Sequence, residues 1–446
     1  MSTYRLLKGH NLKLSGEPQK TVVDFNDSGL RAIHPCQYKG MKPKLTIKQG
    51  DMVKKGEVLL YDKTKESVKI VSPVCGEIQD IVFGKRRVVE KILIKKTGEE
   101  SVSLASHNLD SVNEGELKDF LSNSGMWPCF RQRPFSKVPD PDIKPRSIFV
   151  SMHNTAPFSV DLETVLCDHK DSIAKGLKLL QVLTDGAVYL SLKKGSTFFD
   201  ETDLGNTKVN YFGGPHPSGN MGVQIHHINP VANKDDVVWY ISAQDLVNLT
   251  ESFIRGEYCF NKIIAFGGEG VDKPSYYNVE RGALLKDILG EVNSDNYRVI
   301  SGDALSGSIT TTDHSFGPFD ETVSVISEIQ ERDFLGWALP GLNKYSLSNT
   351  FVSSAMKKEI TDLKTGLNGS IRAIIPFGRW ESLLPMDILP DFLIKSILAE
   401  DIEQMEKLGI YECDPEDFSL CAFACQSKIE VSEIIKSGLE LIEKEG

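Results

Sequence analysis

The sequence predicts a multidomain α/β protein with a doubly wound sheet at its centre. Strand and helix patterns alternate between residues 147 and 261, which is typical of a mainly parallel sheet. Short strands separated by turns fill residues 32–97, and residues 381–446 read as acidic helices. A chain of 446 residues is long enough for about two to four domains, each with its own hydrophobic core.

Composition places the chain among ordinary soluble proteins, with 40% apolar and 25% charged residues. We find no secretory signal and no apolar run long enough to span a membrane. The net charge of −11 is unevenly spread. Residues 1–100 hold 20 basic and 12 acidic side chains (+8), whereas residues 381–446 hold 5 and 16 (−11). One end could therefore face anionic lipid or an acidic partner, and nucleic-acid binding is not expected.

The N-terminal region, residues 1–100, is expected to be a β-rich domain. The order GDxVxxGxxL followed by VSPVxGxI resembles the biotinyl/lipoyl-carrier β-sandwich. That register puts Lys65 where a carrier bears its modified lysine. Lysines at 63 and 69 crowd the position, so an ordinary lysine on a hairpin is the favoured interpretation.

Residues 101–146 are predicted to form an extended connector, because prolines are frequent near their end. This segment carries amphipathic residues that favour an interface with a partner or a quinone. A core contact that pins the connector is an equally good interpretation. Together with the stretch from 377 to 380, the candidate partner-facing residues are Trp127, Phe130, Arg131, Arg133, Phe135, Phe377 and Trp380.

The remaining chain divides into four predicted parts. A Rossmann-like domain spans 147–261, and a small β-grasp (SLBB-like) domain with a hairpin at VISGDALSGSITT spans 262–330. Residues 331–380 are expected to return to the α/β core, and residues 381–446 to form a helical domain. Asp414 before Pro415 is a good helix N-cap.

The stretch YFGGPHPSGNMGVQIHH, residues 211–227, is the most unusual in the chain. A phosphate cradle needs consecutive backbone N–H groups near a helix start. The spacing fits neither GxGxxG nor the P-loop, its prolines lack an N–H, and the stretch contains no Lys or Arg. We therefore expect a turn that brings backbone close to a neighbouring element, without a cofactor, at Gly213, Gly214, His216, Gly219 and Gly222.

Metal binding and catalysis by this chain are not expected. His226 and His227 are placed on a strand, where adjacent side chains point to opposite faces, so they cannot both join His216. The spacing of Cys413, Cys421 and Cys425 does not follow the iron–sulfur pattern. The eight scattered cysteines are expected to be reduced, and no triad, HExxH or Walker motif nominates a catalytic residue.

Five stretches together resemble the A subunit of the Na+-translocating NADH:quinone reductases. They are RPFSKVP (133–139), GGPHPSGNMGVQIHHINPV (213–231), VISGDALSG (299–307), PFGRWESLLPMDILP (376–390) and DPEDFSLCAFAC (414–425). The resemblance covers nearly the whole chain. It implies a respiratory complex of the bacterial inner membrane that oxidises NADH, reduces ubiquinone and exports Na+. It also implies a peripheral protein on the cytoplasmic face, beside the membrane-embedded B subunit.

The same resemblance implies that this chain has no redox cofactor, and that flavins, an iron–sulfur centre and NADH belong to other subunits. A contact with ubiquinone is part of that expectation. Two alternatives stay open. The first is an electron-input subunit that binds flavin or NADH, as in the related Rnf complex, although SGNMG at 218–222 is uncharged. The second is a lipoyl- or biotin-type carrier that uses Lys65.

Overall fold

Sheet A, at the centre of the α/β region, has the strand order β1-β13-β12-β11-β14-β10 in the computed structural model. The structure describes residues 2–329, 335, 339–356, 361–367 and 369–446. All neighbours from β1 to β14 are parallel, and β10 is antiparallel at the edge. The predicted doubly wound sheet is therefore confirmed. Its strands are β1 (Ser2–Arg5), β13 (Lys208–Gly213), β12 (Ala187–Lys193), β11 (Ser147–Ser151), β14 (Val238–Ser242) and β10 (Arg131–Arg133).

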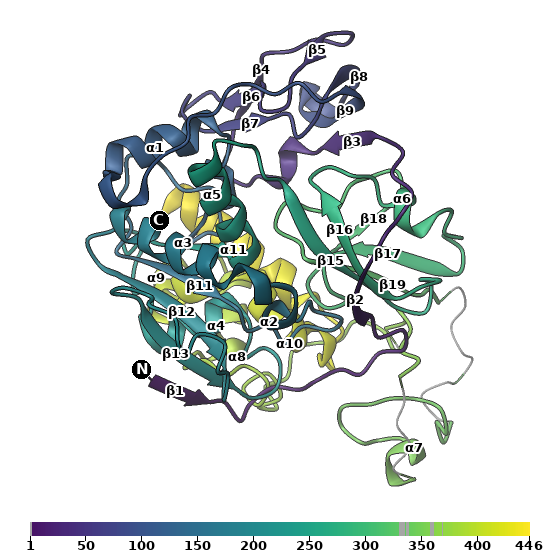
Figure 1. The fold of residues 1–446 in the computed structure, drawn as a ribbon. Helices are drawn as coiled ribbons and strands as arrows, with labels where there is room; N and C mark the ends of the chain where they lie inside the picture. The colour runs from purple at the N-terminus through teal and green to yellow at the C-terminus, as the bar shows by residue number, and fades with distance from the viewer. Residues whose placement is uncertain (1, 330–334, 336–338, 357–360, 368) are drawn as a thin grey trace.

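Helices cover both faces of sheet A, because alternate side chains of each strand point to opposite faces. Ile148 and Val150 of β11 pack in one core with residues of α3 and α5, whereas Phe149 packs in a second core with the C-terminal helices. The second layer of the α/β region is thus built by the end of the chain (Figure 1). The helices are α2 (Leu162–Val165), α3 (Lys170–Val182), α4 (Met221–Ile228), α5 (Ala243–Arg255), α8 (Pro390–Leu398), α9 (Ile402–Lys407), α10 (Ser419–Phe423) and α11 (Val431–Glu445).

The N-terminal domain at the top of Figure 1 contains two small antiparallel sheets around a shared core. Buried Leu59 and Leu60 of β6 meet Ile78 of β8 and Ile92 of β9 in that core. This arrangement confirms the predicted sandwich. The sheets contain β3 (Leu30–Ile33), β9 (Val89–Gly98), β8 (Cys75–Phe83) and β5 (Met52–Val53), and β4 (Pro43–Leu45), β6 (Val58–Asp62) and β7 (Lys69–Val71).

Sheet B forms the third region, with the order β18-β17-β19-β15-β16-β2. Strands β17 and β18 pair antiparallel, as the hairpin predicted at VISGDALSGSITT requires. The short helix α6 (Lys286–Leu289) lies between β16 and β17 along the chain. The strands are β18 (Ser308–Thr310), β17 (Tyr297–Ser301), β19 (Thr322–Ser327), β15 (Asn261–Gly267), β16 (Ser275–Glu280) and β2 (Gln19–Val23).

The first residues of the chain join sheets that belong to other regions. Strand β1 adds to the edge of sheet A beside β13, and β2 adds to the edge of sheet B beside β16. Both strands lie within residues 1–100, which were predicted to form one domain. Pairing between strands that are far apart in the chain leaves no local pattern in the sequence, so it could not be predicted. The segment from β1 to β2 therefore spans sheets A and B (Figure 1).

The segment 101–146 contains a helix, which corrects the expectation of an extended connector. Helix α1 (Glu114–Asn123) begins at Asn113, whose side chain accepts a hydrogen bond from the backbone N–H of Glu116. The Glu116 carboxylate accepts one in return from the Asn113 N–H, which completes a capping box. The buried face of this helix consists of Leu117, Phe120 and Leu121.

The predicted return of residues 331–380 to the α/β core falls partly outside the described residues. The described residues of this range form loops and the short helix α7 (Val352–Ala355), and none of them lies in a strand of either six-stranded sheet. Trp380, at the end of the range, packs into the second core of the α/β region.

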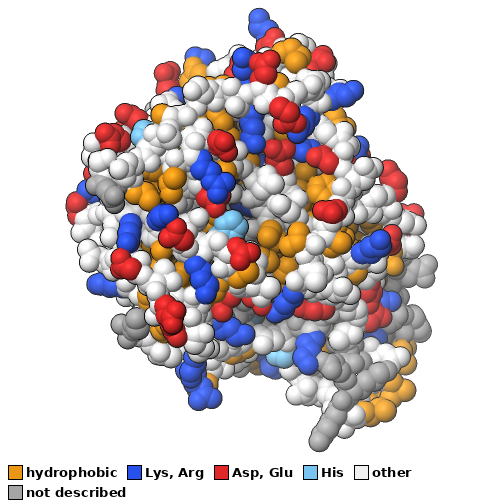
Figure 2. All heavy atoms as spheres, viewed as in Figure 1, with side chains coloured by type: hydrophobic (Ala, Val, Ile, Leu, Met, Phe, Trp, Pro, Cys, Tyr) orange, Lys and Arg blue, Asp and Glu red, His pale blue; other side chains and the backbone are white. Residues whose placement is uncertain are grey.

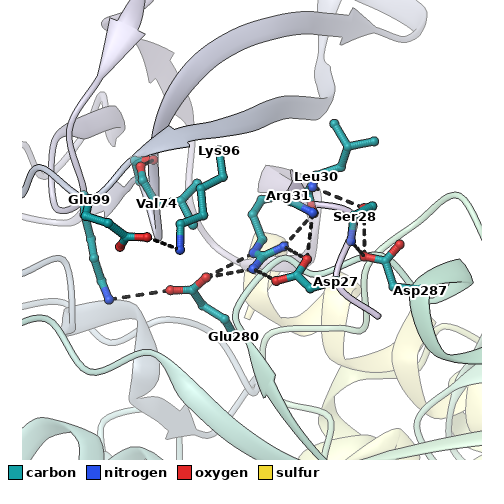
Figure 3. A network of polar contacts seen from close by, with 12 residues as sticks. Asp27, Ser28, Leu30, Arg31, Val74, Lys96, Glu99, Glu280 and Asp287 are labelled. Atoms are coloured by element: carbon teal, nitrogen blue, oxygen red, sulfur yellow. Dashed lines mark hydrogen bonds and ion pairs between the residues drawn. The ribbon is translucent and has the colours of Figure 1, made fainter. Parts of the chain in front are cut away.

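A buried ionic network joins the N-terminal domain to sheet B (Figure 3). The Arg31 side chain, 2% exposed, forms ion pairs with Asp27 at 2.6 Å and Glu280 at 2.9 Å. Lys55 adds a longer contact of 3.5 Å to Glu280. The surface drawn in Figure 2 instead mixes charges of both signs with hydrophobic side chains. In the described part of the chain, no helix is long and apolar enough to cross a membrane.

Candidate functional site at the loop after β13

The glycine-rich loop connects the carboxyl end of β13 to the start of α4. In doubly wound sheets, ligands bind at the carboxyl ends of the strands, and anions bind at helix N-termini. The strand order of sheet A reverses beside β11, so that rule points to the loop after β11. The loop after β13 is a candidate only because the N-terminus of α4 could bind an anion. His226 and His227 lie on α4, so the strand predicted for them was wrong.

The chain itself packs closely against the glycines of this loop. A Cβ atom at Gly214 would lie 2.4 Å from the carbonyl oxygen of Leu6, and one at Gly219 would lie 2.5 Å from the Thr155 nitrogen. Real Cβ atoms do not approach so closely, so these positions need glycine. Next to them, the Gly213 carbonyl accepts a hydrogen bond from the Leu6 N–H at 2.8 Å. Residues from the N-terminus and from the segment after β11 thus contact the loop directly.

His216 is buried in the loop and held by the N-terminal segment. Its backbone N–H donates to Asn11 Oδ1 at 2.7 Å, and its carbonyl accepts from the His10 N–H at 2.8 Å. Thr155 Oγ1 lies 3.3 Å from His216 Nδ1. Burial lowers the pKa of His216, which favours a neutral imidazole. Its role in the structure is to fix the loop to two other segments.

Asp417 fills the space at the N-terminus of α4. A Cβ atom at Gly222, in the first turn of that helix, would lie 1.9 Å from Asp417 Oδ2. The neighbouring Asn220 side-chain amide donates to the Glu416 carbonyl at 3.1 Å. The Asp417 residue is 1% exposed, and burial raises the pKa of its carboxyl well above the usual range. A carboxyl group of the C-terminal region thus packs against the first turn of α4.

Arg133 connects this carboxyl group to the edge of sheet A. Its guanidinium lies 3.1 Å from Asp414, 3.0 Å from Glu416 and 3.7 Å from Asp417. Three carboxyl groups facing one buried guanidinium leave excess negative charge, which favours protonation of at least one of them. Burial, followed by the Asp414 charge, raises the pKa of Glu416 as well. The cluster therefore holds α4, β10 and the C-terminal region together.

Three of the stretches singled out in the sequence meet in this cluster. Arg133 begins RPFSKVP, Gly222 belongs to the glycine loop, and Asp417 belongs to DPEDFSLCAFAC. Sequence reasoning nominated Arg133 and Gly222 but missed Asp417 and Glu416. The two acidic residues lie directly after the Asp414–Pro415 cap. Acidic residues are also common in the first turn of a solvent-exposed helix, so their position did not indicate burial.

Most of the predicted partner-facing residues lie inside the protein. Trp127 is 1% exposed and donates from its indole N–H to the Pro139 carbonyl at 2.8 Å. The Arg131 guanidinium lies between the rings of Tyr240 and Phe319, at 4.6 and 4.7 Å from their centroids. The structure thus favours the interpretation in which these residues fix the segment to the core of the protein. They are Trp127, Phe130, Arg131, Arg133 and Phe135.

Phe377 and Trp380 line a small cavity together with Asp391 and Cys425. Phe377 is 63% exposed, whereas Trp380 is 5% exposed. The cavity holds about 20 Å³, which suits a single water and is far below the roughly 300 Å³ of a small-molecule pocket. A quinone ring therefore has no enclosed pocket at this position in the present conformation.

A larger cleft of about 630 Å³ separates the N-terminal domain from α1. Its walls include Lys69, His107, Asp119 and Tyr258. None of the residues nominated from the sequence lines this cleft. Its size falls within the range of ligand pockets.

Lys65 lies in the turn between β6 and β7, the position of the modified lysine in a carrier domain. Its ammonium group forms ion pairs with Asp142 at 2.5 Å and Asp140 at 3.2 Å. Hydrogen bonds to these carboxylates raise the pKa of Lys65. The segment 101–146 thus covers this lysine, and the geometry does not favour the carrier interpretation.

The C-terminal cysteines are buried free thiols. Burial raises the pKa of Cys413 and of Cys421, so both favour the protonated thiol. Cys413 and Cys421 contact backbone carbonyls, those of Gly409 and Trp380. Within the described ranges, no group of three or more His, Cys, Asp or Glu side chains could hold a metal ion.

The fold and this loop define a class: a multidomain α/β protein in which the glycine-rich loop before α4 packs against the N-terminal segment and the C-terminal region. Three family models match the chain. They are described as NqrA N-terminal barrel-sandwich hybrid domain (residues 4–97), NqrA second alpha/beta domain (112–258) and NQRA C-terminal domain (263–312).

Relatives that match over their full length identify the family. The A subunit of the Na(+)-translocating NADH-quinone reductase of Marinomonas sp. is 37% identical over 453 residues, covering 99% of this chain and 100% of the relative. The proteins of the same name from Yersinia pseudotuberculosis (34%, covering 99% and 100%) and Glaesserella parasuis (37%, covering 98% and 99%) match similarly. The chain belongs to this family, the NqrA family of Na(+)-translocating NADH-quinone reductase subunits.

A solved structure is also similar, at a much lower level. The chain superposes on an NAD+-reducing NiFe-hydrogenase in the air-oxidized state with a TM-score of 0.36 and 12% identity. The superposition covers 77% of this chain and 67% of the hydrogenase chain. A likeness at that level carries no argument about this protein.

Proposed function

We propose that this chain has a structural role in a complex that oxidises NADH, reduces ubiquinone and exports Na+, and that it carries no redox centre of its own. The observation that supports the proposal is the packing at the start of α4. Asp417, a buried carboxyl group of this chain, lies against Gly222 in the first turn of that helix, so an incoming anion would meet a carboxyl group there. Flavins, an iron–sulfur centre and the NADH site would then belong to other subunits.

Absorbance of the purified full-length chain tests this proposal against the flavin- or NADH-binding alternative. We expect no flavin absorbance and no change of intrinsic fluorescence on titration with NADH up to millimolar concentration. Stoichiometric flavin, or saturable NADH binding by the isolated chain, would instead establish an electron-input role.

The partners would be the other subunits of the complex, the membrane-embedded B subunit among them, at the cytoplasmic face of the inner membrane. A group of exposed hydrophobic side chains on and near α8 suits such a contact, because exposed hydrophobic groups mark interaction sites. We call it the α8 surface. Its residues are Ile375, Phe377, Leu389, Phe392 and Leu398.

Charge substitutions test the α8 surface in the assembled complex. Phe377→Asp with Phe392→Asp places two carboxylates in a surface that would be desolvated, so we expect the chain to dissociate from the purified complex. Ile309→Asp is the matched control, because Ile309 is 69% exposed on β18, in sheet B. Equal retention of both variants would contradict docking through this surface.

Ubiquinone contact is proposed only for this same exposed surface, since the cavity beneath Phe377 is too small to enclose a ring. Photo-crosslinking with a quinone analogue in the assembled complex would label this chain near Phe377. Labelling confined to other subunits would limit this chain to a docking role.

A further inference from the structure

The hairpin between β8 and β9 ends in a cationic tip that has no acidic partner in the described part of the chain. Lys85, Arg86 and Arg87 are all exposed. Among the described residues, none of their side chains forms an ion pair or a side-chain hydrogen bond, and Arg87 lies over the Phe83 ring at 5.9 Å. By contrast, Lys65 in the turn between β6 and β7 has two carboxylate partners.

Two hydrophobic side chains flank these cations. Phe83 is 47% exposed and Val88 is 49% exposed, one on each side of the turn. The tip therefore combines an aromatic ring, an aliphatic side chain and three cations. This is the composition of segments that enter the headgroup layer of a bilayer, where apolar groups insert and cations meet anionic lipids.

The backbone of the turn presents the two arginines at the very end of the hairpin. The Val88 N–H donates to the Lys85 carbonyl at 3.3 Å, so Arg86 and Arg87 are the central residues. Both have positive φ, 56° and 58°, as in a type I′ turn. Such positions favour Asn and Gly, so the turn itself does not account for arginine at either place.

We propose that the β8–β9 tip binds the surface of an anionic lipid bilayer. A narrow protruding turn offers little area for a stable protein interface, which needs roughly 800 Å² per partner. The net charge of +8 on residues 1–100 attracts an anionic surface, and the −11 on residues 381–446 turns the opposite region away from it. Figure 1 places this hairpin at the top and α8 in the lower half, so the α8 surface would contact a part of another subunit that extends away from the bilayer.

The lipid proposal does not depend on the absence of a redox centre, and its test involves no cofactor. The full-length chain is sedimented with vesicles of phosphatidylcholine, with or without phosphatidylglycerol as the anionic lipid. We expect binding only to the anionic vesicles, weakening as salt screens the charges. Absence of binding to anionic vesicles at low salt would overturn the proposal, as would binding to polyglutamate without binding to vesicles.

The key variant combines Arg86→Asn with Arg87→Gly. This pair removes both charges and supplies the residues that a type I′ turn prefers, so the hairpin stays formed. At about 1 kcal/mol per cation near the surface, equivalent to about fivefold each, binding should fall roughly 25-fold. The matched control, Lys42→Gln with Lys44→Gln, removes the same charge beside and within β4. Equal losses of vesicle binding in the two double variants would overturn the assignment to the tip. So would unchanged binding in the variant of Arg86 and Arg87.

Insertion of the tip has a separate readout. Phe83→Trp introduces an exposed indole at the hairpin, whose fluorescence should shift to shorter wavelength with anionic vesicles. A shift without vesicle specificity, or no shift while the protein sediments with the vesicles, would contradict insertion of this residue.

Discussion

At the residue scale, Gly222 and Asp417 depend on each other although they are far apart in sequence. A helix position such as 222 would ordinarily favour alanine over glycine by about 1 kcal/mol. The Asp417 carboxyl reverses that preference, because its oxygen lies where the added carbon would be. The glycine serves a contact between the α/β and C-terminal regions.

Substitution Gly222→Ala tests this contact. We expect the free energy of unfolding in urea to fall by about 1–3 kcal/mol, as for other overpacked core positions. In a chain that already carries Asp417→Ala, the same substitution should cost nothing or become stabilising. Additive effects of the two substitutions would contradict a direct contact, because residues in contact show coupling energies.

Asp391 is expected to make the stability of the protein depend on pH. Burial, together with the neighbouring Glu381 carboxyl, raises its pKa from 3.8 to about 6. The folded state therefore binds a proton more tightly than the unfolded state. The contribution of protonated Asp391 to the free energy of unfolding is complete below about pH 4 and is lost as the pH rises to about 6.

Thermal denaturation of the wild type and Asp391→Asn between pH 4 and pH 8 measures this effect. The variant should lack the decrease in stability that Asp391 causes between about pH 4 and pH 6. The difference between the two proteins should then stay constant above that range. Parallel profiles for the two proteins would show that Asp391 titrates normally.

At the scale of elements, β1 supports the glycine loop. Its four residues pair with β13, and the Tyr4 ring stacks on Phe212 with centroids 4.8 Å apart. His10 and Asn11, just beyond this strand, bind the His216 backbone. Without these contacts, β13 would be an exposed sheet edge and the loop would lose its hydrogen bonds.

Deletion of residues 2–11 should therefore increase hydrogen exchange in β13 and in residues 214–217. Exchange in β11 and β12, which are interior strands, should change much less. Leu7→Ala provides the control, since Leu7 is 80% exposed and its side chain contributes little to the strand. Uniformly faster exchange throughout sheet A would mean that β1 stabilises the whole domain instead.

Local patterns in the sequence predicted the elements whose contacts are local. The strands β11 to β14 and helix α5 follow from hydrophobic periodicity, with Ser242 at the helix N-cap and Gly256 at its end. Helix α1 could have been predicted from the Asn113 and Glu116 capping box. Strand β1 could not, because its register depends on a partner some two hundred residues away.

The candidate site could be predicted only in part, for the same physical reason. The unusual glycines of the loop indicated a close approach of backbone, but the approaching group was not identifiable. Arg133 and the aromatic residues near it were singled out as unusual in the sequence. Their burial could not be predicted, because it depends on the pairing of β10 with the edge of sheet A. Residue type alone does not distinguish an aromatic that faces a partner from one that fills a core.

At the scale of the whole molecule, the N-terminal domain and sheet B are coupled through Arg31 (Figure 3). Its pairing partners are Asp27 in its own domain and Glu280 at the end of β16. Removing the buried guanidinium leaves the Glu280 carboxylate, 17% exposed, without compensation, whereas water partly solvates Asp27, which is 40% exposed. We therefore expect this contact to contribute to joint unfolding of the two regions, beside the backbone hydrogen bond from the Ala32 N–H to the Gly282 carbonyl at 2.7 Å.

Arg31→Met keeps the apolar stem and removes the charge. We expect the free energy of unfolding to fall by about 3 kcal/mol, and calorimetry to separate an early transition of the N-terminal domain from the rest. Lys407→Met is the control, because its pair with Glu403 is solvent-exposed and contributes about 0.5 kcal/mol or less. A single transition in Arg31→Met, with a loss no larger than in the control, would show that the domains are coupled by their strands and apolar contacts alone.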